Sequence, residues 1–161
     1  MTTPPHRLNP DRDFIPVRIA ILAVSDTRGL DQDKSGDMLQ GRIEKAGHIL
    51  AARTILRDER AEIADQLREW CADPEIDVVI STGGTGLTGR DVTVEAHRDV
   101  YEKEIEAGGV ANGTYLFALP GSSGACKDAW DEILHWQLDY RHSPCNFVEI
   151  FPRLDEHKRR K

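Results

Sequence analysis

The stretch Ile76–Ala96 reads IDVVISTGGTGLTGRDVTVEA, and it decides which fold we expect. The apolar run Ile76–Ile80 predicts a buried strand, and the residues from Thr93 onward follow a helical pattern. A glycine-rich turn between a strand and a helix presents backbone N–H groups to a phosphate. We therefore expect an anion-binding loop inside an α/β unit.

The same loop carries side chains that suit phosphate chemistry. Arg90 supplies a permanent cation that can grip a phosphate with two N–H groups, and Asp91 supplies a carboxylate of the kind that holds Mg²⁺. No Lys-Ser or Lys-Thr pair follows, so the loop is not a P-loop. Phosphate binding is favoured over a plain connection, because a connection needs neither charged side chain. The loop residues expected at the phosphate are Thr82, Gly83, Gly84, Thr85, Gly86 and Arg90.

Composition limits the class of protein. The chain has 161 residues, 39% of them hydrophobic, which suffices for one domain with a sizeable core. Its net charge of -7 argues against non-specific binding to nucleic acid or to a membrane surface. No apolar run reaches transmembrane length, and the N-terminus lacks a signal-peptide core. The three widely spaced cysteines suit a reducing compartment, so we expect a cytoplasmic protein.

Strand and helix patterns alternate along the chain. This alternation predicts an α/β fold with three layers, in which a mostly parallel sheet has helices on both faces. We expect a flexible N-terminal arm (1–16), one domain (17–154) and a basic C-terminal tail (155–161). The predicted strands are Val17–Val24, His48–Leu56, Ile76–Ile80 and Thr114–Leu119, and the predicted helices are 36–46, 59–71, 93–105 and 125–138.

Several local features can be predicted from residue type. Ser35 and Thr93 stand where helix caps belong, and Asn112-Gly113 predicts a tight turn. Ile133 falls on the expected inward face of the last long helix. The segment 146–150 fits a short helix and an edge strand equally well.

Polar loops follow each predicted strand, and in such folds they meet at the carboxyl edge of the sheet. Ser25 and Asp26 end the first strand, where turn formation and ligand contact are equally plausible. Ser122 precedes the last long helix, so it fits a helix cap and an anion site. This convergence predicts one active crevice.

The two candidate catalytic aspartates have different alternatives. Asp58 stands at an N-cap position before Glu59, and residue chemistry alone favours capping over catalysis there. Asp91 competes with Thr93 for the cap of its helix, and Thr93 is better placed, so a functional Asp91 is favoured. None of the six histidines belongs to a Ser-His-Asp or H-E-x-x-H arrangement, which argues against a hydrolase or a zinc enzyme.

The motifs taken together closely resemble the MoaB/Mog family of molybdenum cofactor biosynthesis proteins, and the MoaB branch in detail. The resemblance rests on STGGTGLTGRDVTVEA, SDT after the first strand, DQDKSGD in the next loop, LRDE after the second strand and FALPGSSGACKDAW late in the chain. These motifs occur in the family's order from about Val17 to Leu154.

The resemblance implies that 17–154 is a molybdopterin-binding domain. Family members adenylylate the terminal phosphate of molybdopterin with Mg-ATP and release pyrophosphate, so ATP and molybdopterin would be the substrates and Mg²⁺ the cofactor. The carboxylates that match Asp58 and Asp91 are the catalytic, metal-associated pair in the family. Homo-trimers or homo-hexamers are usual, and other cofactor-assembly proteins are possible partners. The remaining residues implied at the site are Ser25, Asp26, Pro120, Gly121 and Ser122.

Two other functions stay open at this point. A non-catalytic oligomer that binds and carries molybdopterin would keep the glycine loop but show no Mg-dependent affinity for a nucleotide. A weaker alternative is a nucleotide-binding regulator, which would bind ATP and ignore molybdopterin. Retention of both aspartates favours the enzyme.

One departure from the family pattern leads to a prediction. Relatives carry a longer segment, with its own helix and polar site residues, where Glu106 here is followed directly by Ala107-Gly108. The segment is either deleted from the protein or missing only from the chain as written, and the family-like flanks favour the second. An intact mass of 18.1 kDa would indicate deletion, and a heavier chain would indicate a missing segment. A true deletion would remove one wall of the crevice.

Overall fold

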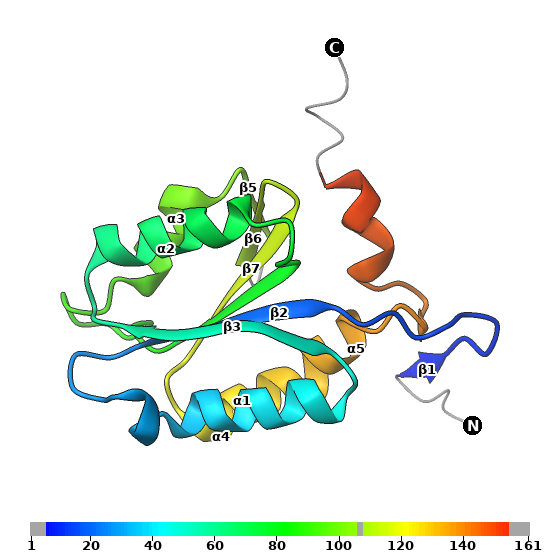
Figure 1. The fold of residues 1–161 in the computed structure, drawn as a ribbon, viewed down its shortest axis with the longest axis horizontal. Coiled ribbons are helices and arrows are strands. Elements are labelled where there is room, and N and C mark those ends of the chain that lie inside the picture. The colour runs from blue at the N-terminus through cyan, green and yellow to red at the C-terminus, as the bar shows by residue number, and fades with distance from the viewer. Residues whose placement is uncertain (1–5, 106–107, 155–161) are drawn as a thin grey trace, which may run out of the picture.

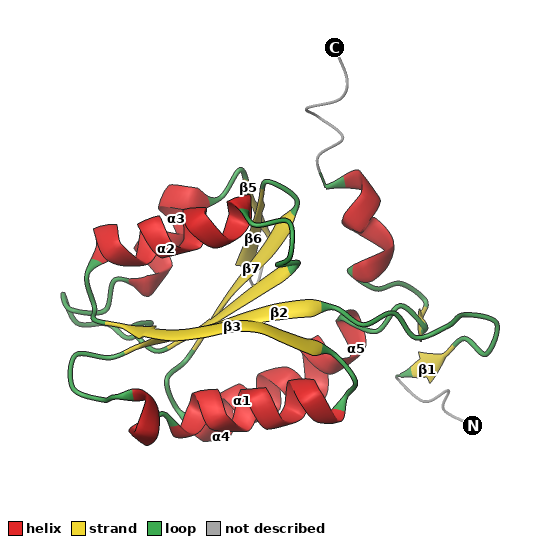
Figure 2. Cartoon of the chain, viewed as in Figure 1, coloured by secondary structure: helices red, strands yellow, loops and turns green. Residues whose placement is uncertain are grey.

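The structure is a computed structural model that describes residues 6–105 and 108–154. Its described part holds a central sheet between two layers of helices (Figure 1), and the strands run through the middle of the molecule (Figure 2). The strands of this sheet are β2 (Arg18–Val24), β3 (Ile49–Leu56), β4 (Val78–Thr82), β5 (Lys103–Ile105), β6 (Gly108–Ala111) and β7 (Thr114–Leu119).

The strand order is β3-β2-β4-β7-β6-β5. Strands β3, β2, β4 and β7 run parallel, whereas β6 and β5 are antiparallel additions at one edge. Helices α1 (Lys34–Lys45) and α4 (Ser123–Ala129) cover one face, and α2 (Arg60–Ala72) and α3 (Thr93–Val100) cover the other (Figure 1). The predicted α/β class with three layers is therefore confirmed. In the described residues, no helix combines the length and apolar character needed to cross a membrane.

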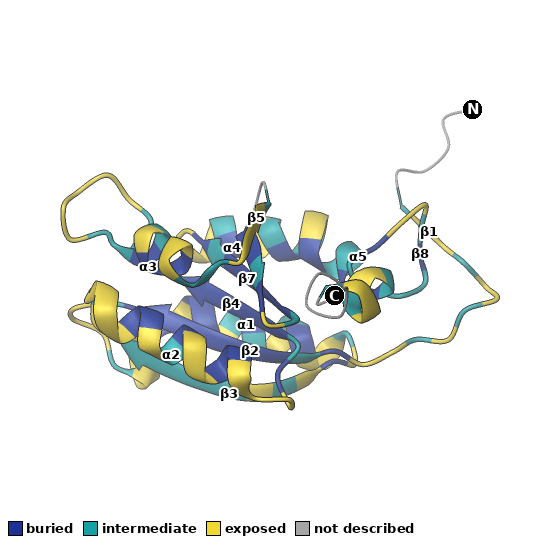
Figure 3. Ribbon diagram, turned by 90° about the horizontal axis from the view of Figure 1, so that it is seen from above, coloured by how far each residue is buried: buried dark blue, intermediate teal, exposed yellow. Residues whose placement is uncertain are grey.

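Strand β2 shows how the sequence produces this layering. Its side chains alternate between the two faces. Ile19 and Ile21 belong to the core cluster that includes Leu39 of α1, while Ala20 and Leu22 belong to the cluster on the α2 side. Both clusters are buried, as the dark central strands of Figure 3 show. Strands β2, β4 and β7 are buried on both faces, whereas the edge strand β3 is only partly buried. The burial of these three strands fixes their carboxyl ends at a common edge.

The helix predicted to reach Ile105 ends earlier. α3 stops at Val100, and Lys103–Ile105 pairs with β6 instead. A side chain at Gly109 of β6 would collide with the ring of Tyr101. The absence of a side chain at Gly109 therefore lets Tyr101 pack directly on β6 and lets the chain enter the sheet. This packing between neighbouring segments overrides the local helix propensity.

Three other local predictions also need correction. Asp33, and not Ser35, caps α1, because its carboxylate accepts the N–H of Gly36 at 2.9 Å. Thr93 makes no capping bond, and Val92 occupies the cap position of α3. Ile133 is 53% exposed, because the π-helical turn Trp130–Leu134 rotates it away from the core.

One of the other local predictions, the tight turn, is confirmed. Asn112 and Gly113 form the expected turn with φ of 50° and 79°. The ambiguous segment 146–150 contributes to a 3₁₀ helix, Val148–Arg153. Within the expected arm, β1 (Arg7–Leu8) pairs with β8 (His142–Ser143). The rest of the expected arm, 1–5, and the expected tail, 155–161, lie outside the described residues.

His97 links α3 to the sheet beneath the glycine loop. It is fully buried, its Nε2 lies 2.8 Å from the hydroxyl of Ser81, and its Nδ1 lies 3.2 Å from the hydroxyl of Tyr101. Burial lowers the pKa of His97 to about 4. Burial likewise lowers the pKa of His48 to about 4.

We expect the free energy of unfolding to fall as the pH drops from about 6.5 toward 4. Unfolded His97 takes up a proton near pH 6.5, whereas the folded form does so only near pH 4, so protons favour the unfolded chain between these values. The full effect of this residue is about 3 kcal/mol. Urea unfolding of the parent protein and of His97→Gln, at pH 7 and at pH 4.5, measures this change in the free energy of unfolding. Equal pH dependence in both proteins would contradict the assignment.

Candidate functional site

The loops after β2, β3, β4 and β7 meet around one cleft at the carboxyl edge of the sheet, as the sequence predicts. The cleft has a volume of about 470 Å³. Thr85, Gly86, Arg90, Asp91 and Pro120 are not among its lining residues. The predicted site residues that do line it are Ser25, Asp26, Asp58, Thr82, Gly83, Gly84, Gly121 and Ser122.

The glycine loop passes very close to the end of β2. Gly83 and Gly84 have φ of 93° and 65°, which favours glycine. A side chain at Gly83 would collide with the carbonyl oxygen of Val24, and the N–H of Gly83 donates to Leu119 at 3.1 Å. These glycines therefore join the ends of β2, β4 and β7, in addition to any contact with a ligand.

Asp58 does not cap a helix, so the interpretation favoured by residue chemistry alone is wrong. The cap position of α2 belongs to Glu59, which makes no side-chain capping bond. The Oδ1 atom of Asp58 is buried and has no hydrogen-bond partner. Burial, followed by the charges of Asp26 and Asp91, raises the pKa of Asp58. Buried polar atoms without a partner are uncommon and often mark functional positions.

Asp91 neither caps α3 nor pairs with its neighbour Arg90. Its Oδ2 accepts hydrogen bonds from the N–H of Thr88 at 3.0 Å and from the hydroxyl of Thr88 at 2.7 Å. The hydrogen bonds from Thr88, together with one from the backbone of Gly86, lower the pKa of Asp91. The glycine loop thus holds Asp91 in its ionised form.

Arg90 connects the glycine loop to the turn after β2. Its Nη2 donates to Asp26 Oδ1 at 2.9 Å, its Nε donates to Asp26 Oδ2 at 3.2 Å, and Glu59 accepts at 3.4 Å. Asp26 also accepts the backbone N–H of Asp58 at 3.1 Å, and this bond, followed by the one from Arg90, lowers the pKa of Asp26. Arg90 therefore contacts carboxylates on two other loops.

The hydroxyl groups predicted at the site mainly fold the loops. Ser25 Oγ accepts the N–H of Arg28 at 3.1 Å and closes the turn after β2. Thr82 donates to the carbonyl of Pro120 at 3.0 Å. Ser122 caps α4 by accepting the N–H of Ala125 at 3.1 Å. These bonds position the walls of the cleft.

The predicted site residues leave out seven residues that line the cleft, and Asp33 and Ser35 are two of them. Asp33 is buried and pairs with Arg53 at 3.1 Å, and Ser35 donates to the carbonyl of Gly121 at 2.8 Å. Both belong to the DQDKSGD motif. This motif is the sequence signal that could have identified them, but the position of Ser35 also fits a helix cap, which hides its part in the cleft.

The described residues include no group of three or more His, Cys, Asp or Glu side chains arranged to hold a metal ion. Mg²⁺ does not need such a cage, because it binds through one or two carboxylates and takes its other ligands from phosphates and water. Asp58 and Asp91 fit this requirement. The charge of Asp91 contributes to the raised pKa of Asp58, and Asp58 retains an oxygen without a partner.

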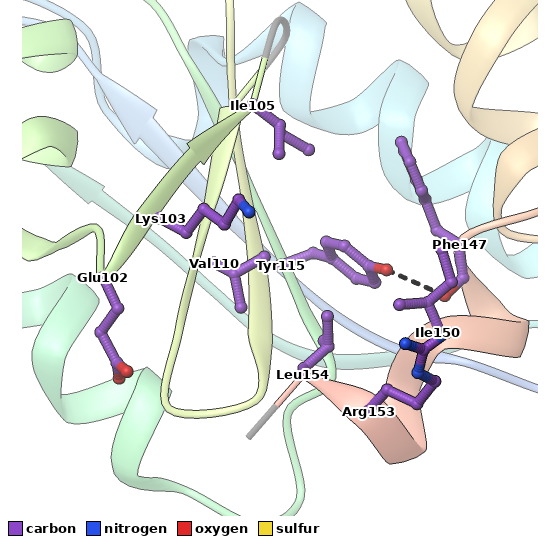
Figure 4. A pocket seen from close by; sticks show the side chains of 9 residues that line it. All are labelled: Glu102, Lys103, Ile105, Val110, Tyr115, Phe147, Ile150, Arg153 and Leu154. Atoms are coloured by element: carbon purple, nitrogen blue, oxygen red, sulfur yellow. Dashed lines mark hydrogen bonds between the residues drawn. The ribbon is translucent and has the colours of Figure 1, made fainter. Parts of the chain in front are cut away.

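A second hollow lies between strands β5, β6 and β7 and the 3₁₀ helix Val148–Arg153, and its lining is more apolar than that of the cleft. It has a volume of about 530 Å³ and contains none of the predicted site residues. Tyr115 crosses it and donates to the carbonyl of Phe147 at 3.0 Å, and Ile105, Val110 and Leu154 face the same space (Figure 4). This apolar hollow offers no carboxylate pair comparable to Asp58 and Asp91.

The chain is similar in sequence to a family of pterin-binding domains and to proteins of molybdenum cofactor biosynthesis. The family described as "Probable molybdopterin binding domain" matches residues 20–140. Molybdenum cofactor biosynthesis protein B of Escherichia coli (strain K12) is 39% identical over 158 residues, which cover 84% of this chain and 93% of that protein. The protein of the same name from Bacillus subtilis (strain 168) is 34% identical over 142 residues, covering 73% and 84%.

The fold leads to the same group of proteins. A crystal structure of a molybdenum cofactor biosynthesis protein B superimposes with a TM-score of 0.78 and 28% identity, covering 90% of this chain and 99% of that one. The Escherichia coli alignment is longer than the part of this chain that it covers, so that protein has residues without a counterpart here. Because the matches span the strands and loops that build the cleft, the chain belongs to the MoaB/Mog family of molybdenum cofactor biosynthesis proteins.

Proposed function

We propose that the protein transfers AMP from Mg-ATP to the terminal phosphate of molybdopterin. The observation that carries this proposal is the buried, unpaired Oδ1 of Asp58 in a cleft shared with the glycine loop. A fold that only binds molybdopterin does not need a buried carboxylate oxygen without a hydrogen-bond partner. A reaction that brings two phosphates together needs a cation to balance their negative charge, and a carboxylate such as Asp58 would hold that cation.

The transfer is a substitution at phosphorus. An oxygen of the molybdopterin phosphate attacks the α-phosphorus of ATP, and a new P–O bond forms. The bond from that phosphorus to the bridging oxygen breaks, and pyrophosphate leaves with the bonding electrons. Such reactions depend on alignment and on charge neutralisation more than on a protein nucleophile.

The aspartates divide the work according to their surroundings. When bound, Mg²⁺ supplies neutralisation of the charge on the transferred and leaving phosphates. Asp91 is ionised and fixed by Thr88, and Asp58 faces the cleft with a raised pKa. Together they would hold the cation between the glycine loop and the loop after β3. The backbone of Gly83 and Gly84 would bring the attacking phosphate close.

Arg90 would exchange partners during binding. It now contacts Asp26 and Glu59, and its side chain is 60% exposed. A phosphate entering beside Asp26 competes for the same guanidinium group, because Arg binds carboxylates and phosphates with the same geometry. Binding would therefore release the loop contact and add a cation to the site.

We also propose that the working form is a homo-trimer or a homo-hexamer in the cytoplasm, where other cofactor-assembly proteins would deliver and receive the pterin. This extends the family's usual assembly to the chain. Analytical ultracentrifugation of the purified protein distinguishes these forms from a monomer.

The first prediction tests the reaction itself. Purified protein with molybdopterin and Mg-ATP should yield AMP-linked molybdopterin and pyrophosphate, detected by chromatography and mass spectrometry. Product should disappear when EDTA removes Mg²⁺. Tight molybdopterin binding without product, and without Mg-dependent ATP affinity, would identify a carrier instead. ATP binding without molybdopterin binding would identify a nucleotide-binding regulator.

The second prediction concerns Asp91→Asn. The amide oxygen of Asn can still accept the bonds from Thr88, so the loop and molybdopterin binding should persist. Loss of the charge should lower turnover about 10²- to 10³-fold, the size found when one group that stabilises transition-state charge is removed. Single-turnover rates measure the expected loss of turnover, and the affinity for molybdopterin measures whether binding persists. Asp65→Asn is the matched control, because Asp65 is 79% exposed on α2. Normal turnover by Asp91→Asn would remove Asp91 from the mechanism.

A further inference from the structure

Thr93 is a buried hydroxyl without an evident structural purpose. It is the first residue of α3 and is fully buried, yet its Oγ1 has no hydrogen-bond partner. An unpaired buried hydroxyl costs stability, and a valine would fill a similar volume without that cost. Thr93 also makes no capping bond for α3. The usual reasons for a threonine at this position therefore do not apply.

The other unpaired oxygen of the site faces the same point. A Cβ at Gly84 would lie closer than 3.0 Å to Thr93 Oγ1 and also to Asp58 Oδ1. The two oxygens therefore approach the same small space, one from α3 and one from the loop after β3. Both are buried, and one is a natural donor while the other is a natural acceptor.

The backbone around Thr93 is firmly placed. Its N–H donates to the carbonyl of Gly84 at 3.0 Å. One turn later, His97 lies 2.8 Å from the hydroxyl of Ser81, which ends the apolar part of β4. α3 is thus fixed to both the glycine loop and the sheet, so the direction of the Thr93 side chain is set by the fold.

We propose that Thr93 is a positioning residue for Asp58. Its hydroxyl donates to Asp58 Oδ1 when the site is engaged, and this bond aims Oδ2 into the cleft. The inference rests on the proposed function, in which Asp58 holds the cation. Carboxylates that bind metal ions are themselves held by hydrogen bonds, and loss of such a partner typically costs 10- to 100-fold in metal affinity or activity.

The test compares Thr93→Val with Thr93→Ser. Thr93→Val should lower turnover about 10- to 100-fold with little change in the KM for ATP, and Thr93→Ser should restore turnover because it keeps the hydroxyl. The melting temperature of Thr93→Val should be unchanged or higher, since the variant removes an unpaired buried hydroxyl. A threonine with only a structural role would give a lower melting temperature and normal turnover, which would overturn the proposal.

Thr114→Val is the matched control. Thr114 is also buried, but its hydroxyl donates to the carbonyl of Ile76 at 3.4 Å, at the amino end of β7 and away from the cleft. This variant should lose some stability and keep its turnover. A variant at Thr93 that loses turnover without losing stability, beside a variant at Thr114 that loses stability without losing turnover, would show that Thr93 positions Asp58 and does not serve packing alone.

A second measurement does not depend on transfer. In crystals soaked with Mg²⁺ and ATP, Thr93 Oγ1 should lie within hydrogen-bond distance of Asp58 Oδ1, and Mn²⁺ affinity read by electron paramagnetic resonance should fall about tenfold in Thr93→Val. A separation beyond 3.5 Å, or unchanged Mn²⁺ affinity, would overturn the proposal. Failure of the proposed function would show as absent transfer by the parent protein, whatever these two readouts give.

Discussion

The close approach of the glycine loop to the end of β2 is the constraint on which the site depends. Gly83 lies against the carbonyl of Val24, and the Cα of Gly83 lies 3.3 Å from the point where a Cβ of Gly121 would stand. Three strand ends therefore meet through backbone with no side chains between them. Any larger residue would push the loops apart and open the cleft. Burial of the parallel strands on both faces supplies the rigidity that makes this approach possible.

The sequence predicted those features that repeat along the chain. Apolar runs such as Ile76–Ile80 predicted the parallel strands, and the parallel arrangement predicted that their loops would meet. The features it did not predict depend on packing that the hydrophobic pattern does not show. α3 ends at Val100 because Tyr101 packs on Gly109, and no local pattern near Val100 announces that contact. Likewise, the π-helical turn that exposes Ile133 interrupts a regular helical pattern without a visible sequence signal.

At the candidate site too, some features could be predicted from the sequence and others could not. Residue types and loop positions were predictable, but pairing within the site was not. Arg90 and Asp91 are adjacent in sequence, yet Arg90 contacts Asp26 and Asp91 contacts Thr88. Neighbouring side chains in an irregular loop need not point the same way, so adjacency says little about pairing. The position of Asp58 likewise predicts a helix cap, because an aspartate before a helix usually is one, yet Asp58 makes no capping bond.

The electrostatics of the cleft link these observations to function. Hydrogen bonds lower the pKa values of Asp26 and Asp91, whereas burial and these same two charges raise the pKa of Asp58. A protein with a net charge of -7 that gathers three aspartates at one edge repels phosphates there. Under the proposed function, a cation held between Asp58 and Asp91 would reverse that repulsion and would also reduce the repulsion between the two aspartates. Under the proposed function, binding of the two anionic substrates is therefore coupled to the cation. The glycine loop would supply close backbone contact, and the metal would add positive charge to that of Arg90.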